Sequence, residues 1–151
     1  MFQIKVAAKK EEIIPVIEAL SIYLHEAGCS EETVYALEVA LEELITNIVN
    51  YAYPAGCDMA YMEVLCAMEE TPEQKRTEQE TPERYERVIV TLIDEGIAYN
   101  PLEQPEPDIE LPLEKRSIGG LGIYMTKHLI DELEYHRRDG KNILILKNKV
   151  K

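Results

Sequence analysis

Two residues four positions apart, Glu43 and Asn47, form the first pair in the chain whose types could do chemistry. In a helix they lie about 40° apart on one face. That face points away from the apolar positions Leu41 and Ile48, and Asn50 shares it. A carboxylate and an amide oxygen are hard ligands that could hold a magnesium ion or its waters. The glutamate could also act as a general base toward a hydroxyl or water. Taken alone, such a pair on a polar helix face is more often simply solvated.

The second group is Asp94-Glu95-Gly96, which follows an apolar run. A strand that ends in Asp places a carboxylate at the rim of a sheet, where it could accept a hydrogen bond from an exocyclic amine such as that of adenine. Gly96 would let the backbone approach a ring closely, because it has no side chain. A turn that uses Asp and Gly only for their backbone preferences explains the same residues.

The third group is Gly119-Gly120-Leu121-Gly122, which precedes an apolar helical pattern. Glycines at a helix start expose backbone N–H groups at its positive end, and this favours anion binding. A tight turn is the alternative. The sequence contains neither a Walker loop nor the dinucleotide-binding fingerprint, so the nucleotide sites with those motifs are excluded.

These groups need elements to position them, and the apolar spacing predicts a series of helices and strands. The clearest helix begins after Ser30, a good N-cap, and ends before Pro54; its apolar residues are spaced alternately three and four apart. The other expected elements are a strand over 2–6, a helix over 9–27, strands over 59–68 and 88–93, a helix over 123–133 and a hairpin over 133–150. This order predicts an α+β two-layer sandwich, with helices on one face of a mixed, mostly antiparallel sheet.

Two segments have little to bury. Residues 69–87 are highly charged and contain two Thr-Pro-Glu triplets, so we expect an extended, mobile hairpin loop. Residues 101–112 hold four of the eight prolines, which excludes a helix or a central strand there.

Length and charge limit the class of protein. The chain has 151 residues, which predicts a single domain over 1–151. The formal net charge of −13 argues against a direct nucleic-acid binder and against docking on an anionic membrane. Residues 136–151 are nevertheless basic, which suits either a solvated strand edge bearing lysines or a docking patch.

Three cysteines without C-x-x-C spacing predict buried, reduced thiols rather than a disulfide framework or a zinc site. We find no signal peptide and no apolar run long enough to cross a membrane, so the expected location is the cytoplasm.

Together, the three groups resemble the motif series of the GHKL ATPases, which share the Bergerat fold and include histidine kinases, gyrases and certain chaperones. Within that superfamily the chain is most similar to the stand-alone anti-sigma factor serine/threonine protein kinases. The likeness lies in E-x-x-T-N followed by Ala-Tyr-Pro, in D-E-G-x-x-[FY]-N-P, and in G-G-L-G-[IL]-x-[LM]. It covers nearly the whole chain. Tyr51 departs from the pattern, because many relatives have His there.

The resemblance implies roles for residues that match the family motifs. Asn47 corresponds to the magnesium ligand and Glu43 to the proposed general base. Asp94 corresponds to the carboxylate that recognises the adenine amine, and Gly96 to the glycine beside the ring.

The remaining matches concern the nucleotide's other groups. Asn100 lies on the nucleotide-side turn, and Gly120 and Gly122 correspond to the phosphate-side glycines. Residues 102–118 correspond to the ATP lid over the phosphates, which suits their proline content and acidity.

The resemblance therefore implies a kinase that uses ATP and Mg²⁺, binds a sigma factor, and phosphorylates a serine or threonine of an antagonist protein. It also implies a homodimer. One alternative is an ATP-binding regulatory protein that acts by association without kinase activity; another is a regulator outside transcription. The presence of Glu43 beside Asn47 favours the kinase, because a pure binding module has no use for a base.

Overall fold

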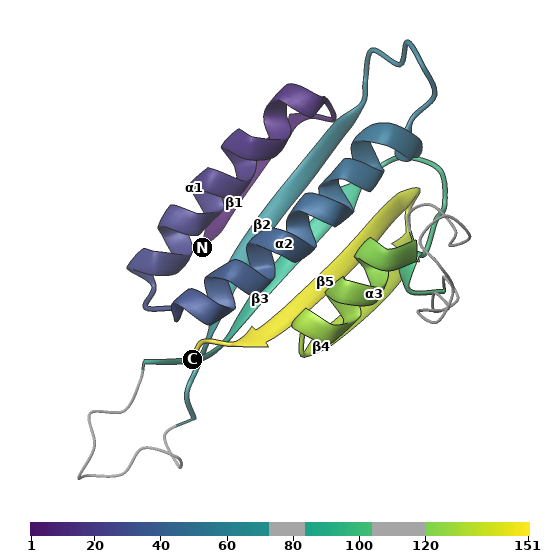
Figure 1. Cartoon of the computed structure of the whole chain (residues 1–151). Coiled ribbons are helices and arrows are strands. Elements are labelled where there is room, and N and C mark those ends of the chain that lie inside the picture. Colours follow the sequence, from purple (N-terminus) through teal and green to yellow (C-terminus); the bar gives the residue numbers. More distant parts are fainter. Residues whose placement is uncertain (73–83, 104–119) are drawn as a thin grey trace, which may run out of the picture.

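The chain folds as two layers, with helices on one face of a five-stranded sheet (Figure 1). The computed structural model describes residues 1–72, 84–103 and 120–151. The main elements are β1 (Phe2–Ala7), α1 (Ile13–Glu26), α2 (Glu31–Asn47), β2 (Tyr61–Glu70), β3 (Tyr85–Asp94), α3 (Gly120–Leu129), β4 (Glu132–Arg138) and β5 (Lys141–Lys149). Short helical segments are η1 (Lys10–Glu12), the π-helical η2 (Ile48–Ala52) and η4 (Pro101–Glu103). The predicted α+β two-layer sandwich is confirmed.

The strand order is β1-β2-β3-β5-β4, so β3 occupies the middle of the sheet. Every strand pairing among the described residues is antiparallel, so the sheet expected to be mostly antiparallel is entirely antiparallel in this part of the chain. The hairpin β4–β5 turns at Asp139 and Gly140, both with positive φ, as the Asp-Gly pair predicts.

Helix α2 lies between α1 and α3 across the covered face of the sheet (Figure 1). Its start is fixed by Ser30, whose hydroxyl oxygen accepts a hydrogen bond from the Thr33 backbone N–H at 3.2 Å. Its apolar stripe packs on alternate, inward-facing residues of the strands, and residues such as Leu37, Ile45 and Val64 have no exposed surface. A continuous apolar core therefore joins the two layers.

Both ends of helix α3 differ from the sequence prediction. Helix α3 begins at Gly120 and ends at Leu129, not at 123 and 133. It ends there because the Asn148 side chain accepts a hydrogen bond from Asp131 N at 2.7 Å and donates one to Leu129 O at 3.3 Å.

Both predicted bounds of the loop over 69–87 are wrong. Glu69 and Glu70 belong to β2, and 85–87 belong to β3, because the ladder continues past the last apolar residues. Most of the remainder, 73–83, lies outside the described residues, and so do 104–118 of the expected lid.

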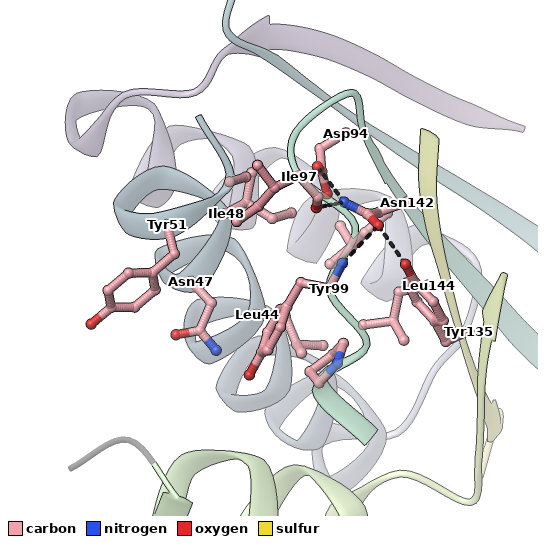
Figure 2. A pocket seen from close by; sticks show the side chains of 13 residues that line it. Leu44, Asn47, Ile48, Tyr51, Asp94, Ile97, Tyr99, Tyr135, Asn142 and Leu144 are labelled. Carbon is pink, nitrogen blue, oxygen red and sulfur yellow. Dashed lines mark hydrogen bonds between the residues drawn. The ribbon is translucent and has the colours of Figure 1, made fainter. Parts of the chain in front are cut away.

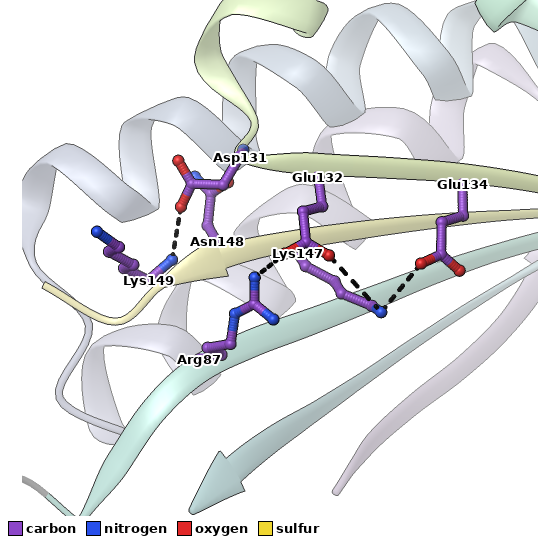
Figure 3. A network of polar contacts seen from close by, with 7 residues as sticks. All are labelled: Arg87, Asp131, Glu132, Glu134, Lys147, Asn148 and Lys149. Atoms are coloured by element: carbon purple, nitrogen blue, oxygen red, sulfur yellow. Dashed lines mark hydrogen bonds and ion pairs between the residues drawn. The ribbon is translucent and has the colours of Figure 1, made fainter. Parts of the chain in front are cut away.

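A polar network crosses the uncovered face of the sheet at its β4 edge (Figure 3). Lys147 donates a hydrogen bond to Glu134 at 3.1 Å and lies 3.9 Å from Glu132, which also accepts from Arg87. The Lys147 ammonium, with His136, lowers the pKa of Glu134. β5 is an internal strand, so Lys147 belongs to an ion-pair network on a sheet face rather than to a lysine-bearing edge.

Among the described residues, no helix combines the length and apolarity needed to span a lipid bilayer.

The three thiols occupy two environments. Cys66 and Cys29 are buried, and Cys57 is exposed. Burial raises the pKa of Cys66 to about 12 and also raises the pKa of Cys29. Since the thiolate is the reactive form, both buried thiols are expected to be inert near neutral pH.

We predict that a thiol-specific chromogenic disulfide labels one cysteine rapidly at pH 8, and all three in denaturant. Cys57→Ser should abolish the rapid phase; two or more fast-reacting thiols in the native protein would contradict the burial.

The unfolded chain loses the Cys66 proton above about pH 9, while the folded chain keeps it. This thiol therefore lowers the free energy of unfolding as pH rises toward 12, by at most about 1.4 kcal/mol per pH unit.

Candidate functional site

A cavity of about 320 Å³ opens where the end of α2, the turn after β3 and the β4–β5 hairpin meet (Figure 2). Its wall is mainly apolar with a few polar groups, a common composition for a small-molecule site. It is lined by Leu44, Asn47, Ile48, Tyr51, Ala52, Leu92, Asp94, Ile97, Tyr99, Pro101, Tyr135, Asn142 and Leu144. The cavity thus brings together two predicted site residues, Asn47 and Asp94, that are far apart in the sequence.

Asp94 is the last residue of β3 and is only 6 % exposed. Its Oδ1 accepts hydrogen bonds from Gly96 N and Asn142 Nδ2, both at 2.9 Å. Among the described residues, no donor bonds its Oδ2. A buried carboxylate with one satisfied oxygen and one open oxygen can accept a hydrogen bond from a ligand amine in the cavity.

Asn142, at the start of β5, connects this carboxylate to the following turn (Figure 2). Its Nδ2 also donates to Ile97 O at 2.7 Å, and its Oδ1 accepts from Tyr99 N at 3.3 Å. The Tyr135 hydroxyl donates to the same Oδ1. Asn142 is 7 % exposed, so these bonds satisfy an amide that burial would otherwise penalise.

The turn after β3 is held from the helix side as well. Ile97 N donates to Ala52 O at 2.9 Å, using a carbonyl at the end of η2. The Tyr53 hydroxyl accepts from Glu95 N at 2.8 Å. A β-carbon on Gly96 would collide with the Ala52 backbone. Gly96 is therefore needed for the close approach of turn and helix, a reason independent of any bound ring.

Glu43 and Asn47 share one face of α2, about 6 Å apart along its axis, as the spacing predicts. Asn47 lines the cavity, whereas Glu43 lies against Gly122 of α3, where a β-carbon would collide with the Glu43 carboxyl. Within the described part of the chain, neither side chain has a hydrogen-bonding or ionic partner. Within that part, Glu43 and Asn47 are thus two neighbouring polar side chains at the cavity that have no bonding partner.

The other predicted residues lie around this centre. The Asn100 Oδ1 accepts from Leu102 N at 2.9 Å and so caps the short helix η4; Asn100 is not among the residues lining the cavity. Gly120 is the first residue of α3, and Gly122 lies in the same first turn. Of the expected lid, only Leu102 and Glu103 are described.

Sequence reasoning missed Asn142 as part of the site. A signal was available, because Asn142 and Asn148 interrupt the inward-facing series that Leu144, Leu146 and Val150 continue. A polar residue at an inward position of a strand must find buried partners. The aromatic residues around the mouth, Tyr51 and Tyr99, gave no such signal.

The Asn47 amide oxygen would suit a magnesium ion only if phosphate oxygens and waters supplied the other ligands. Among the described residues, no group of three or more His, Cys, Asp or Glu could hold a metal alone. Mg²⁺ usually keeps several waters and takes only one or two protein oxygens when it binds with a phosphate substrate. The unpaired Asn47 amide beside the cavity meets that requirement.

Comparisons with known proteins agree with this geometry. Residues 6–148 match the model of the histidine kinase-like ATPase domain. The serine/threonine-protein kinase BtrW of Bordetella bronchiseptica is 30 % identical over 112 residues, covering 74 % of this chain and 68 % of BtrW. The serine-protein kinase RsbW of Bacillus cereus is 22 % identical over 149 residues, covering 96 % of this chain and 82 % of RsbW.

A solved structure shows the same fold. It contains the RsbU and RsbW domains of Rv1364c from Mycobacterium tuberculosis and superposes with a TM-score of 0.57 at 15 % identity. The match covers 98 % of this chain but 32 % of that longer chain.

Proposed function

Because the chain belongs to the histidine kinase-like ATPase domain family, we propose that it binds ATP and transfers the terminal phosphate to a serine or threonine of another protein. The observation that carries the proposal is the cavity between Asn47 and the buried Asp94. The relatives named as serine and serine/threonine kinases support a serine or threonine as the acceptor of the phosphate. In this proposal, residues 1–151 act as one ATPase domain.

The base of ATP would enter the apolar part of the cavity, with its 6-amino group donating to Asp94. The open Oδ2 of Asp94 supports this orientation, because an acceptor suits an amine and disfavours the 6-oxo group of guanine. Gly96 and Asn100 would hold the turn beside the base, consistent with their packing and capping contacts.

The phosphates would extend toward the first turn of α3. Backbone N–H groups at Gly120 and Gly122 would favour their negative charge, since a helix start is positive. In the resemblance, 102–118 correspond to the lid over the phosphates, and only Leu102 and Glu103 of this segment are described. Asn47 would hold Mg²⁺ with the phosphates, and bound Mg²⁺ would neutralise developing charge during transfer.

Glu43 would orient the acceptor hydroxyl and take its proton. Its lack of a hydrogen-bonding or ionic partner among the described residues supports this role, because a carboxylate held in an ion pair would be a weaker base. In this proposal, its place one helical turn before Asn47 would bring it to the metal and phosphate side of the site.

The proposed protein partners are a sigma factor, which the protein would sequester, and an antagonist protein, which would carry the acceptor residue. The net charge of −13 supports a partner with basic surface, as expected of a DNA-binding protein. Direct nucleic-acid binding is not part of the proposal, and a homodimer stays a prediction from the resemblance.

Asp94→Asn should weaken binding of Mg-ATP by about 10- to 100-fold, because it replaces a charged acceptor facing the base with an amide. Isothermal titration calorimetry measures the change. The matched control is Asp131→Asn, which alters an exposed Asp that bonds Lys149 N away from the cavity, and it should leave the affinity unchanged. Undiminished binding by Asp94→Asn would remove the adenine assignment.

Glu43→Gln should lower the rate of phosphate transfer by about 10²- to 10⁴-fold, the usual contribution of a general base, and should leave ATP affinity within about twofold. The assay uses γ-labelled ATP and candidate antagonist proteins. Glu42→Gln, on the adjacent exposed position of α2, should retain full activity.

Unchanged transfer by Glu43→Gln would show that this residue is not the base. If the wild-type protein binds ATP but labels none of the acceptors, the alternative is favoured: a regulatory protein that acts by association without kinase activity.

A further inference from the structure

Side chains of the β4–β5 hairpin hold the turn that carries Asp94. Asn142 bonds Asp94 itself, and Arg137 Nη1 donates to Gly96 O at 2.9 Å. We propose that Asn142, held in place by Tyr135, is a positioning residue that fixes the Asp94 carboxylate for recognition of the 6-amino group of the base. This inference rests on the proposed function of Asp94.

Asn142 acts through Asp94 because its own polar atoms are occupied. Both hydrogens of Nδ2 are donated, to Asp94 Oδ1 and to Ile97 O, and Oδ1 accepts from Tyr99 N and the Tyr135 hydroxyl. An asparagine amide offers two donors and one oxygen with two lone pairs, so no capacity is left for a ligand. Asn142 lines the cavity without a free group to bind its contents.

The same bonds determine which Asp94 oxygen meets the base. Asn142 Nδ2 and Gly96 N both bond Oδ1, which leaves Oδ2 as the open acceptor. Without the amide, Oδ1 would lose one of its two donors and the carboxylate could rotate. The orientation of the open oxygen thus depends on Asn142.

The Tyr99 N–H, which can only donate, determines the orientation of the amide, and the Tyr135 hydroxyl adds a second bond to Asn142 Oδ1. A flipped amide would turn the Nδ2 hydrogens toward the Tyr99 N–H. Both acceptors on the other side, Asp94 Oδ1 and Ile97 O, would then face an oxygen. The observed arrangement is the one in which every donor meets an acceptor.

Asn148 offers a matched control within the same strand. It is 5 % exposed on the same face of β5, and its amide also bonds backbone groups, at Asp131 and Leu129. It lies outside the cavity. Asn148→Ala therefore reproduces the loss of a buried amide without touching the turn that carries Asp94.

The test compares two ligands, Mg-ATP and the magnesium complex of purine riboside triphosphate, which is ATP without the 6-amino group. Calorimetry gives both dissociation constants for the wild type, Asn142→Ala, Tyr135→Phe and Asn148→Ala, with thermal melts as folding controls. We expect the wild type to prefer ATP by about tenfold or more, the value of a hydrogen bond to a charged group. The ratio should fall to about threefold or less in Asn142→Ala and stay unchanged in Asn148→Ala.

Tyr135→Phe keeps the ring and removes one neutral hydrogen bond to Asn142, so it should lower the ratio by about twofold, less than Asn142→Ala does. It decides the question if Asn142→Ala does not fold. A wild-type ratio near one would overturn the role of Asp94 and this inference with it. A preserved wild-type preference in Asn142→Ala or Tyr135→Phe would overturn the positioning role alone. An equal loss of preference in Asn148→Ala would also overturn it, since the effect would then be structural.

Discussion

The site depends on a carboxylate that is buried at the end of the central strand. Asp94 is nearly inaccessible, and a buried charged group is tolerated only when hydrogen bonds compensate for its lost hydration. The Asn142 amide and the Gly96 N–H supply that compensation at one oxygen. Because the donors come from β5 and from the turn, satisfying the carboxylate also fixes where the turn lies. The cavity follows from this arrangement.

The opposite wall of the site is built on a different physical basis. Glu43 and Asn47 are positioned by helix periodicity and by the packing of α2 on α3, and not by hydrogen bonds of their own within the described part of the chain. Gly122 allows α3 to approach the Glu43 carboxyl so closely that a larger residue there would displace this carboxyl. One wall of the cavity is thus held by hydrogen bonds that leave Asp94 Oδ2 open, while the other carries Asn47, whose amide has no partner within the described residues.

Much of the fold could be predicted from the sequence, because the spacing of apolar residues is regular. The periodicity of α2, the Ser30 cap and the Asp139-Gly140 turn are local signals, and each is confirmed. The predicted elements in turn made the α+β two-layer sandwich the expected fold. Glu43 and Asp94 could be selected as candidate site residues from their residue types and from the order of the motifs that contain them. Their roles remain predictions.

Tertiary contacts were harder to predict. The end of β2 at 69–70 and the start of β3 at 85–87 are rich in charged residues. They are strand only because they pair with each other. The end of α3 is set by Asn148, which comes 19 residues after Leu129. Gly96 suggested freedom to approach a ligand, yet its nearest neighbour is Ala52, a contact no local pattern reveals.

The two inward-facing asparagines of β5 show how such information could be recovered. An alternating strand that places Asn where its neighbours have Leu must bury a polar group, so each Asn implies backbone groups elsewhere that need a partner. Asn148 meets the end of α3, and Asn142 meets the turn after β3. Each thus joins β5 to a segment that would otherwise leave backbone groups unsatisfied. In a strand of this kind, exceptions to the apolar pattern mark the places where the sheet positions its loops.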